Sequence, residues 1–168
     1  MTPDDMAATS SAEPTLSEEE QAEVDAADQA EPLIEDFIRM NTNASADPDD
    51  FNRGDFEDVA ISTAQRDLEN RLESLRNFGN TNEGREEVIS ISQPEFFDLD
   101  NPDEPAVVEY LVCTDISDIT NFDADGVDIT PEERADRVLK KYGIANYEYP
   151  DETQWRVAYA EWQEGESC

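Results

Sequence analysis

The most strand-like stretch of this sequence is Val107-Val-Glu-Tyr-Leu-Val-Cys-Thr114, an apolar, β-branched run with a cysteine in its interior. Residues of these types favour a strand inside a sheet. The other cysteine is the last residue, Cys168, which follows a second strand-like run, Trp155-Arg-Val-Ala-Tyr-Ala-Glu-Trp162. A terminal cysteine has little reason to be buried as a small hydrophobe, because chain ends are normally frayed. We therefore expect a disulfide between Cys113 and Cys168. The alternative is two free thiols, one buried and one exposed.

A disulfide closing that loop would stabilise the fold by about 4 kcal/mol in the chain-entropy model. It would also place the protein in an oxidising, extracytoplasmic compartment. The first residues, Met1-Thr-Pro-Asp-Asp5, lack the basic region and apolar core of a signal peptide. A disulfide therefore requires either a signal removed upstream or another route of export. The remaining alternative is that both thiols are reduced.

The charge is strongly acidic: 44 Asp and Glu residues stand against 11 Lys and Arg, for a net charge of −33. Phosphate backbones and anionic membrane surfaces would repel such a chain, so we exclude nucleic acid and membrane surfaces as partners. No apolar run approaches the roughly 20 residues of a membrane span. Such a surface confers solubility, and it also suits a salty environment, where counterions screen the self-repulsion.

Low aliphatic content with high net charge is typical of disordered chains, but the apolar residues of this chain are clustered. Residues 1–31 contain few of them, and periodic clusters begin at Leu33. We therefore predict a flexible acidic leader over residues 1–16 and a single folded domain over residues 17–168.

Helical patterns fill the first half of that domain. Ser17-Glu-Glu-Glu20 is a capping box, which predicts a helix over residues 17–41 that is kinked or restarted at Pro32. The polar residues 41–50 predict a loop, and the two phenylalanines that follow predict a short helical turn around residues 51–56.

In the next segment apolar residues recur at every third or fourth position: Ile61, Ala64, Leu68, Leu72, Leu75 and Phe78. This spacing predicts an amphipathic helix, and Gly79 is a suitable C-terminal cap. The leucine face of that helix needs an apolar surface to pack on, which a following sheet would supply.

After residue 84 the apolar period changes to two, which is typical of strands. Four strands are expected, within residues 88–92, 107–116, 135–149 and 155–162. Ile116 to Phe122 is a candidate continuation of the second strand, and Asp123-Ala-Asp-Gly126 predicts a hairpin turn. In the last strand, Trp155, Val157 and Tyr159 are expected to share one face. Helices followed by antiparallel strands predict an α+β fold.

Four stretches resemble one group of proteins. They are the leader with Leu16–Val24, Val112-Cys-Thr-Asp-Ile-Ser-Asp118, Phe122-Asp-Ala-Asp-Gly-Val-Asp128, and Gln154-Trp-Arg-Val157 with the terminal cysteine. The layout resembles the nuclear-transport-factor-like cone, also called the SnoaL-like or cystatin-like fold. More narrowly, it resembles small extracytoplasmic proteins and lipoproteins of actinobacteria and their phages, although this chain has no lipobox cysteine. The resemblance implies N-terminal helices packed on a strongly curved, cone-like sheet of four antiparallel strands, in a group without an established activity.

The sequence contains no histidine, which excludes His-based acid–base catalysis, nucleophile–histidine pairs and histidine metal ligands. Some enzymes of the cone fold use an aspartate alone, and the candidate acids on apolar stretches are Asp36, Glu109 and Asp115. Each of these acids is as well explained as a carboxylate on a solvent-exposed face of its helix or strand as it is by a catalytic role. The acids of residues 123–128 suggest a calcium loop, but their spacing fails the EF-hand pattern. We therefore predict no catalytic residue, no metal site and no cofactor.

Five aromatic residues are candidates to line a ligand pocket at the mouth of a cone: Phe37, Tyr110, Tyr142, Trp155 and Tyr159. The alternative is that they form the ordinary core. Our leading hypothesis is a non-catalytic extracytoplasmic accessory module, stabilised by one disulfide, that binds a small ligand, a partner protein or a second copy of itself. The second hypothesis is a cytoplasmic cone-fold enzyme, isomerase- or hydrolase-like, from a salt-loving organism, with a buried aspartate.

Overall fold

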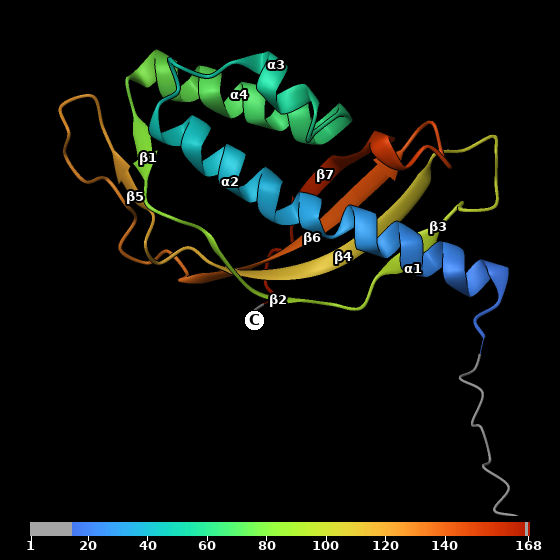
Figure 1. Ribbon diagram of the computed structural model, residues 1–168. Helices are drawn as coiled ribbons and strands as arrows, with labels where there is room; N and C mark the ends of the chain where they lie inside the picture. Colours follow the sequence, from blue (N-terminus) through green and yellow to red (C-terminus); the bar gives the residue numbers. More distant parts are fainter. Residues whose placement is uncertain (1–14, 167) are drawn as a thin grey trace, which may run out of the picture.

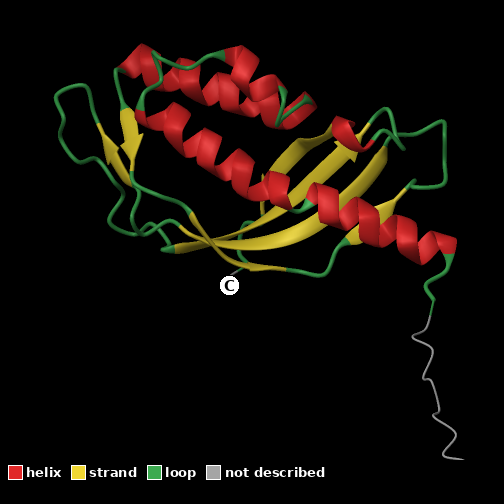
Figure 2. Ribbon diagram, in the orientation of Figure 1, coloured by secondary structure: helices red, strands yellow, loops and turns green. Residues whose placement is uncertain are grey.

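The computed structural model describes residues 15–166 and 168. Most of the predicted leader, residues 1–14, lies outside the described residues. Four helices come first along the chain and strands follow, so the predicted α+β class is confirmed (Figures 1 and 2). The helices are α1 (Glu18–Ala30), α2 (Pro32–Ala46), α3 (Arg53–Glu57) and α4 (Ser62–Phe78). The strands are β1 (Thr81–Glu83), β2 (Glu87–Ile91), β3 (Glu95–Phe97), β4 (Ala106–Asp115), β5 (Thr120–Phe122), β6 (Arg137–Asn146) and β7 (Trp155–Trp162).

The main sheet has five antiparallel strands in the order β2-β4-β6-β7, with β3 also paired to β4. Strands β2 and β3 share one edge of β4, because β3 pairs with residues 107–109 and β2 with residues 112–115. The prediction of four strands missed β3 in this sheet, and it also missed the short strands β1 and β5. Strands β1 and β5 form a separate two-stranded arm beside the helices (Figure 1).

The ends of the first helices follow the local sequence signals. Ser17 accepts a hydrogen bond from the backbone N–H of Glu20, whose side chain accepts one in return from the Ser17 N–H, so the predicted capping box is confirmed. Pro32 is the first residue of α2, where its missing N–H costs nothing. The predicted loop from residue 41 is wrong at its start, because α2 continues to Ala46. Burial of Ala44 and Ser45 holds those extra residues in the helix.

The helix predicted from the leucine pattern is α4, and Gly79 ends it with a left-handed backbone at φ 68°. Its buried residues, Ala64, Leu68 and Leu72, pack in the same core as the buried residues of α2 and of the inner face of the sheet. The fully buried side chains of this core, by size, are Tyr110, Tyr142, Phe56, Ile34, Leu72, Ile144, Val108, Val112 and Val157. The helices therefore cover one face of the sheet, as Figure 2 shows, and the opposite face carries polar side chains, such as Glu109 and Lys141, together with apolar ones, such as Leu111 and Leu139.

A bulge in β7 corrects the predicted faces of that strand. Gly143 of β6 pairs with Tyr159, but the next residue, Ile144, pairs with Val157, so Ala158 is an extra residue. The bulge turns Tyr159 to the outer face, away from Trp155 and Val157. There its ring lies over Gly143, where a Cβ would come within 2.0 Å of the ring. Its hydroxyl donates a hydrogen bond to Glu109.

The segment expected to continue β4 does not do so. The chain turns at residues 116–119, where the Ile119 N–H donates to the Ile116 carbonyl at 3.0 Å, and then pairs with β1 as strand β5. The predicted turn at residues 123–126 is present, with Gly126 at φ 77° and its N–H bonded to the Asp123 carbonyl at 3.0 Å.

The disulfide predicted between Cys113 and Cys168 is present, with the two sulfurs 2.06 Å apart. Cys113 is buried on the outer face of β4, where it pairs with Leu139 of the neighbouring strand β6. The β7 pairing continues to Gln163, whose N–H donates to the Leu139 carbonyl at 2.9 Å. The chain end then returns to β4, so the disulfide fastens the last residues across β6.

Candidate functional site

The five aromatic residues predicted to line a pocket divide between the two faces of the sheet. Phe37, Tyr110, Tyr142 and Trp155 lie in the core, and Tyr159 lies outside it on the outer face. The rings of Phe37 and Tyr142 meet edge to face, with centroids 6.0 Å apart. Burial is the main cause that raises the pKa of both Tyr110 and Tyr142, which therefore stay protonated.

The three candidate acids lie on different elements and do not converge. Asp36 is on the exposed side of α2 and forms an ion pair with Arg39 at 2.6 Å. Glu109 is on the outer face of β4 and accepts the Tyr159 hydroxyl. Asp115 ends β4, where side-chain and backbone hydrogen bonds from Ser117 lower its pKa.

The acids of the suspected calcium loop act as turn caps. Asp123 accepts hydrogen bonds from the backbone N–H groups of Asp125 at 3.0 Å and Val127 at 2.9 Å. Asp128 accepts from the Thr130 N–H at 2.8 Å. No group of three potential metal-binding side chains occurs among residues 15–166 and 168.

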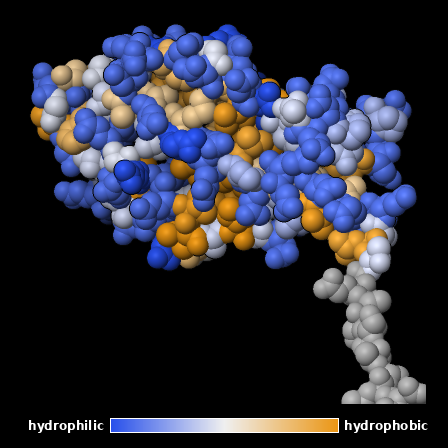
Figure 3. All heavy atoms as spheres, viewed as in Figure 1, coloured by the Kyte–Doolittle hydropathy of each residue, from blue (hydrophilic) through white to orange (hydrophobic). Residues whose placement is uncertain are grey.

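A groove of about 690 Å³ runs between α2 and the segment that enters β2; we call it the α2 groove. It is lined on one side by Glu35, Ile38, Arg39, Thr42 and Asn43, and on the other by residues 84–88. In Figure 1 that segment runs from the arm of β1 and β5 back toward the main sheet, below α2. Figure 3 shows hydrophobic atoms between the helices and the strands on this side, within a mostly hydrophilic surface.

A smaller space of about 40 Å³ adjoins the α2 groove; we call it the inner chamber. It is lined by Asn41, Thr42, Ser45, Arg71, Asn82, Glu83, Gly84 and Ile119. Thr42 and Gly84 line both spaces. Most of these side chains are polar, which distinguishes the inner chamber from an apolar packing defect.

The backbone on one side of both spaces is fixed by Gly84. This residue has φ +110°, and a Cβ would stand 2.2 Å from the Asp118 carbonyl oxygen, so no other residue fits without movement. The next N–H, that of Arg85, donates to the Asp118 side chain at 3.0 Å. These contacts hold the β1–β2 connection against the turn at residues 116–119 and set the position of Arg85 at the groove.

Arg71 reaches the inner chamber from α4. Its guanidinium donates a hydrogen bond of 3.0 Å to the Ser45 hydroxyl, which itself donates to the Asn41 carbonyl at 2.8 Å. The surrounding protein lowers the pKa of Arg71 by desolvation, and the nearby charge of Glu86 opposes that shift. Solvent still reaches the side chain, so it remains a cation that a ligand can approach.

The nearby carboxylate of Glu86 is occupied. It accepts hydrogen bonds from Lys140 at 2.6 Å and from the buried Thr114 hydroxyl at 2.7 Å, and its side chain is 7% exposed. The ion pairs among the described residues include neither Arg71 nor Arg85. Arg134 and Arg156 form no ion pair among the described residues either, so what distinguishes Arg71 and Arg85 is that they line two adjoining spaces.

The sequence interpretation missed these arginines. The available signal was their scarcity, since 11 basic residues are few enough to follow one by one along the predicted elements. Arg71 lies on the polar side of the leucine-faced helix, and Arg85 lies just before the first predicted strand. No pattern in the sequence places these residues at two adjoining spaces, because tertiary packing of α2 against the connection from β1 to β2 forms those spaces.

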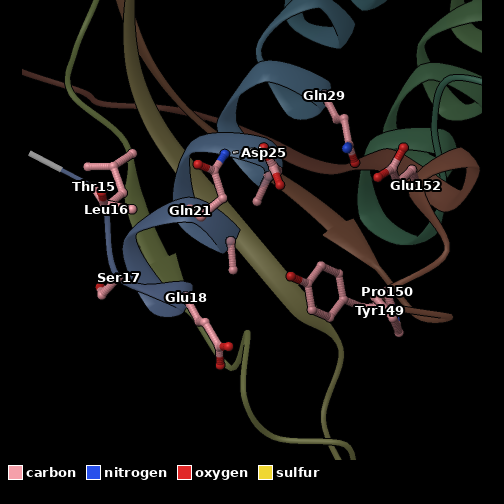
Figure 4. Close-up of a pocket in the computed structure, with 12 residues that line it drawn as sticks. Thr15, Leu16, Ser17, Glu18, Gln21, Asp25, Gln29, Tyr149, Pro150 and Glu152 are labelled. Carbon is pink, nitrogen blue, oxygen red and sulfur yellow. Dashed lines mark hydrogen bonds between the residues drawn. The ribbon is translucent and has the colours of Figure 1, made fainter. Parts of the chain in front are cut away.

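A second groove, of about 470 Å³, lies between α1 and the turn at Tyr149 and Pro150 (Figure 4). Figure 4 shows the Tyr149 ring pointing toward α1. The charged residues that line the groove are Glu18, Asp25 and Glu152, all acidic. Carboxylates at a groove are expected anywhere on so acidic a surface, so this groove is a weaker candidate than the α2 groove.

None of the helices in the described part of the chain is both long and apolar enough to cross a membrane.

No protein-family model matches this sequence, and no curated protein matches it. Among solved structures, the crystal structure of the intermembrane space region of the chloroplast protein ARC6 is similar, with a TM-score of 0.54. The two sequences are 13% identical over a match that covers 81% of this chain and 95% of that one. At this identity the similarity shows a shared α+β fold and nothing about activity.

Proposed function

We propose that this protein is a non-catalytic binding module with a cone-like fold, held by one disulfide, that binds an anionic group of its ligand in the α2 groove. The observation that carries the proposal is that Arg85, which lines the α2 groove, and Arg71, which lines the adjoining inner chamber, form no ion pair within the described part of a chain of net charge −33. The α2 groove also has carboxylates in its lining, from Glu35, Glu86 and Glu87, and Glu86 is paired with Lys140. An arginine offers five N–H donors in a fork that suits carboxylate and phosphate groups.

The disulfide supports an extracytoplasmic location for this module, because such bonds form and persist in oxidising compartments. The structural neighbour is described as the intermembrane space region of a chloroplast protein, so a domain of similar fold occurs in a location of that kind. The resemblance to extracytoplasmic proteins of actinobacteria and their phages stays part of this proposal. The hypothesis of an enzyme with a buried aspartate gains no support, since none of the aspartates in the described residues is buried.

The test is a titration of the ¹⁵N-labelled full chain with sodium phosphate and with sodium acetate at constant ionic strength. We expect saturable shifts of the backbone amides of residues 84–88 and of α2. Arg85→Ala should weaken the binding by about tenfold, as expected for the loss of one charge-assisted hydrogen bond.

The matched control is Arg66→Ala, on the exposed side of α4 beside Asp67. It removes the same charge from the chain, so general electrostatics would weaken binding equally in both variants. Equal losses, or no saturable shift with either anion, would contradict the proposal.

A further inference from the structure

Two residues that line the inner chamber offer a hydrogen-bond donor and an acceptor. The donor is the guanidinium of Arg71, for which one hydrogen bond, to the Ser45 hydroxyl, occurs within the described residues. The acceptor is the side-chain oxygen of Asn41, which is buried and has no hydrogen-bond partner among them. A buried polar group without a partner costs about 1–3 kcal/mol, so such groups usually mark a missing water, ion or ligand.

The direction of the existing bonds limits what can satisfy these groups. The Ser45 hydroxyl donates its hydrogen to the Asn41 backbone carbonyl, so in its bond with Arg71 it acts as the acceptor. Solvent reaches the remaining N–H groups of Arg71, and an anion is a stronger acceptor for them than water. The Asn41 side-chain oxygen requires a donor.

The charges around the chamber allow an anion. Glu86 is the carboxylate whose charge acts most strongly on Arg71, but it is already paired with Lys140 and bonded to Thr114. Glu83 also lines the chamber, and its side chain is exposed, so it can turn to solvent. Arg71 is therefore the one guanidinium among the chamber-lining residues, with no ion-pair partner in the described structure.

The volume of the inner chamber limits the size of the ligand group that it can hold. A space of about 40 Å³ has room for roughly three water-sized groups, since one water needs about 10–15 Å³ of such a cavity. A carboxylate has three heavy atoms, so a neighbouring donor that bonds Asn41 has to lie where the chamber meets the α2 groove, at Thr42, the next residue along the helix. The shared lining at Thr42 and Gly84 lets the rest of a ligand extend into the α2 groove.

We propose that the inner chamber binds the carboxylate of a ligand that carries an N–H or O–H donor on the neighbouring carbon, as in 2-hydroxy and 2-amino acids. The carboxylate pairs with Arg71, and the neighbouring donor bonds the side-chain oxygen of Asn41. This proposal rests on the proposed function, because it names the ligand class of the same site.

The experiment compares sodium acetate, glycolate and glycine as probes of the full, disulfide-bonded chain, each titrated at constant ionic strength. Acetate carries the carboxylate alone, glycolate adds an O–H donor, and glycine adds an N–H donor. We expect glycolate and glycine to bind about tenfold more tightly than acetate, which is the worth of one hydrogen bond to a buried acceptor. The largest amide shifts should lie at residues 41–45 and 82–84.

Two variants show which side chain causes the binding of the carboxylate and which causes the preference for an added donor. Asn41→Leu should bind acetate as the original chain does but lose the preference for glycolate and glycine. Arg71→Gln should weaken all three probes together. The thermal unfolding midpoint of each variant establishes that it is folded at the titration temperature.

The outcomes separate the two proposals. If all three acids bind equally, or if Asn41→Leu keeps the preference, the inference about the ligand class is overturned while anion binding stands. If none of the acids binds and phosphate does not bind either, the proposed function fails as well.

Discussion

Replacing the terminal cysteine by serine is the most direct perturbation of the fold. Cys168 is exposed, so Cys168→Ser removes the cross-link while leaving the core intact. The bond closes a loop of 55 residues, and the chain-entropy model gives about 4 kcal/mol for a loop of that length. For a domain of this size each kcal/mol moves the thermal midpoint by about 2–4 °C, so we expect a fall of about 8–16 °C.

Urea unfolding followed by tryptophan fluorescence measures this loss, because Trp155 is buried in the native state. A reducing agent should lower the stability of the original chain to that of Cys168→Ser and leave the variant unchanged. The original chain without reductant should show no reactive thiol. A loss of stability below about 1 kcal/mol would refute the reasoning, since the cross-link would then hardly restrict the unfolded chain.

Three further predictions concern single side chains. Gly143→Ala should destabilise the fold by about 1–3 kcal/mol in urea unfolding, because the new methyl group overlaps the ring of Tyr159; adding Tyr159→Ala should recover part of the loss. Lys140→Met should cost about 3 kcal/mol by leaving the carboxylate of Glu86 unpaired in a largely buried position, and Glu86→Gln in the same chain should reduce that cost. Asp115→Asn should destabilise the protein at neutral pH but not in acid. The pKa of Asp115 is lower in the folded state than its unfolded value of about 3.9, so its carboxylate stabilises the fold above that pH, and this stabilisation is lost as the pH falls through the folded pKa. The urea midpoints of the variant and the original chain should therefore converge in acid.

The parts of the fold that depend on local chemistry were predictable from the sequence. The capping box at Ser17, the helix start at Pro32 and the left-handed cap at Gly79 each act within a few residues of where they occur. The long strands β4 and β7 were also predictable, because each is a run of eight residues or more that is rich in β-branched and aromatic side chains.

The parts that depend on distant contacts were not predictable. Strands β1, β3 and β5 have three residues each, which is too short for a period to be recognised, and pairing with remote segments defines them. The bulge at Ala158 is likewise set by the register with β6. It moved Tyr159 out of the aromatic group that the simple alternation predicted.

The candidate site is also one of the parts that depend on distant contacts. Asn41 lies in a stretch whose polar sequence favours a loop, and burial of Ala44 and Ser45 keeps it helical instead. The extra turn of α2 is what places Asn41 and Ser45 beside Arg71. Since tertiary packing overrides local propensity at this point, a reading of local patterns could not find the chamber.

The charge of the whole molecule and the charge of the site act over different distances. At physiological ionic strength a charge is screened within about 8 Å, so most of the 44 acids contribute little to the potential at one guanidinium. What decides the potential in the inner chamber is the nearest charges: Arg71 without an ion pair, the exposed Glu83 that also lines the chamber, and the more distant Glu86, which is paired with Lys140 at 2.6 Å. An acidic surface therefore repels anions in general, while a site of this kind can still bind one that reaches it. We expect Lys140→Met to weaken anion binding in the titrations, because it leaves Glu86, whose charge acts on Arg71, without its cation.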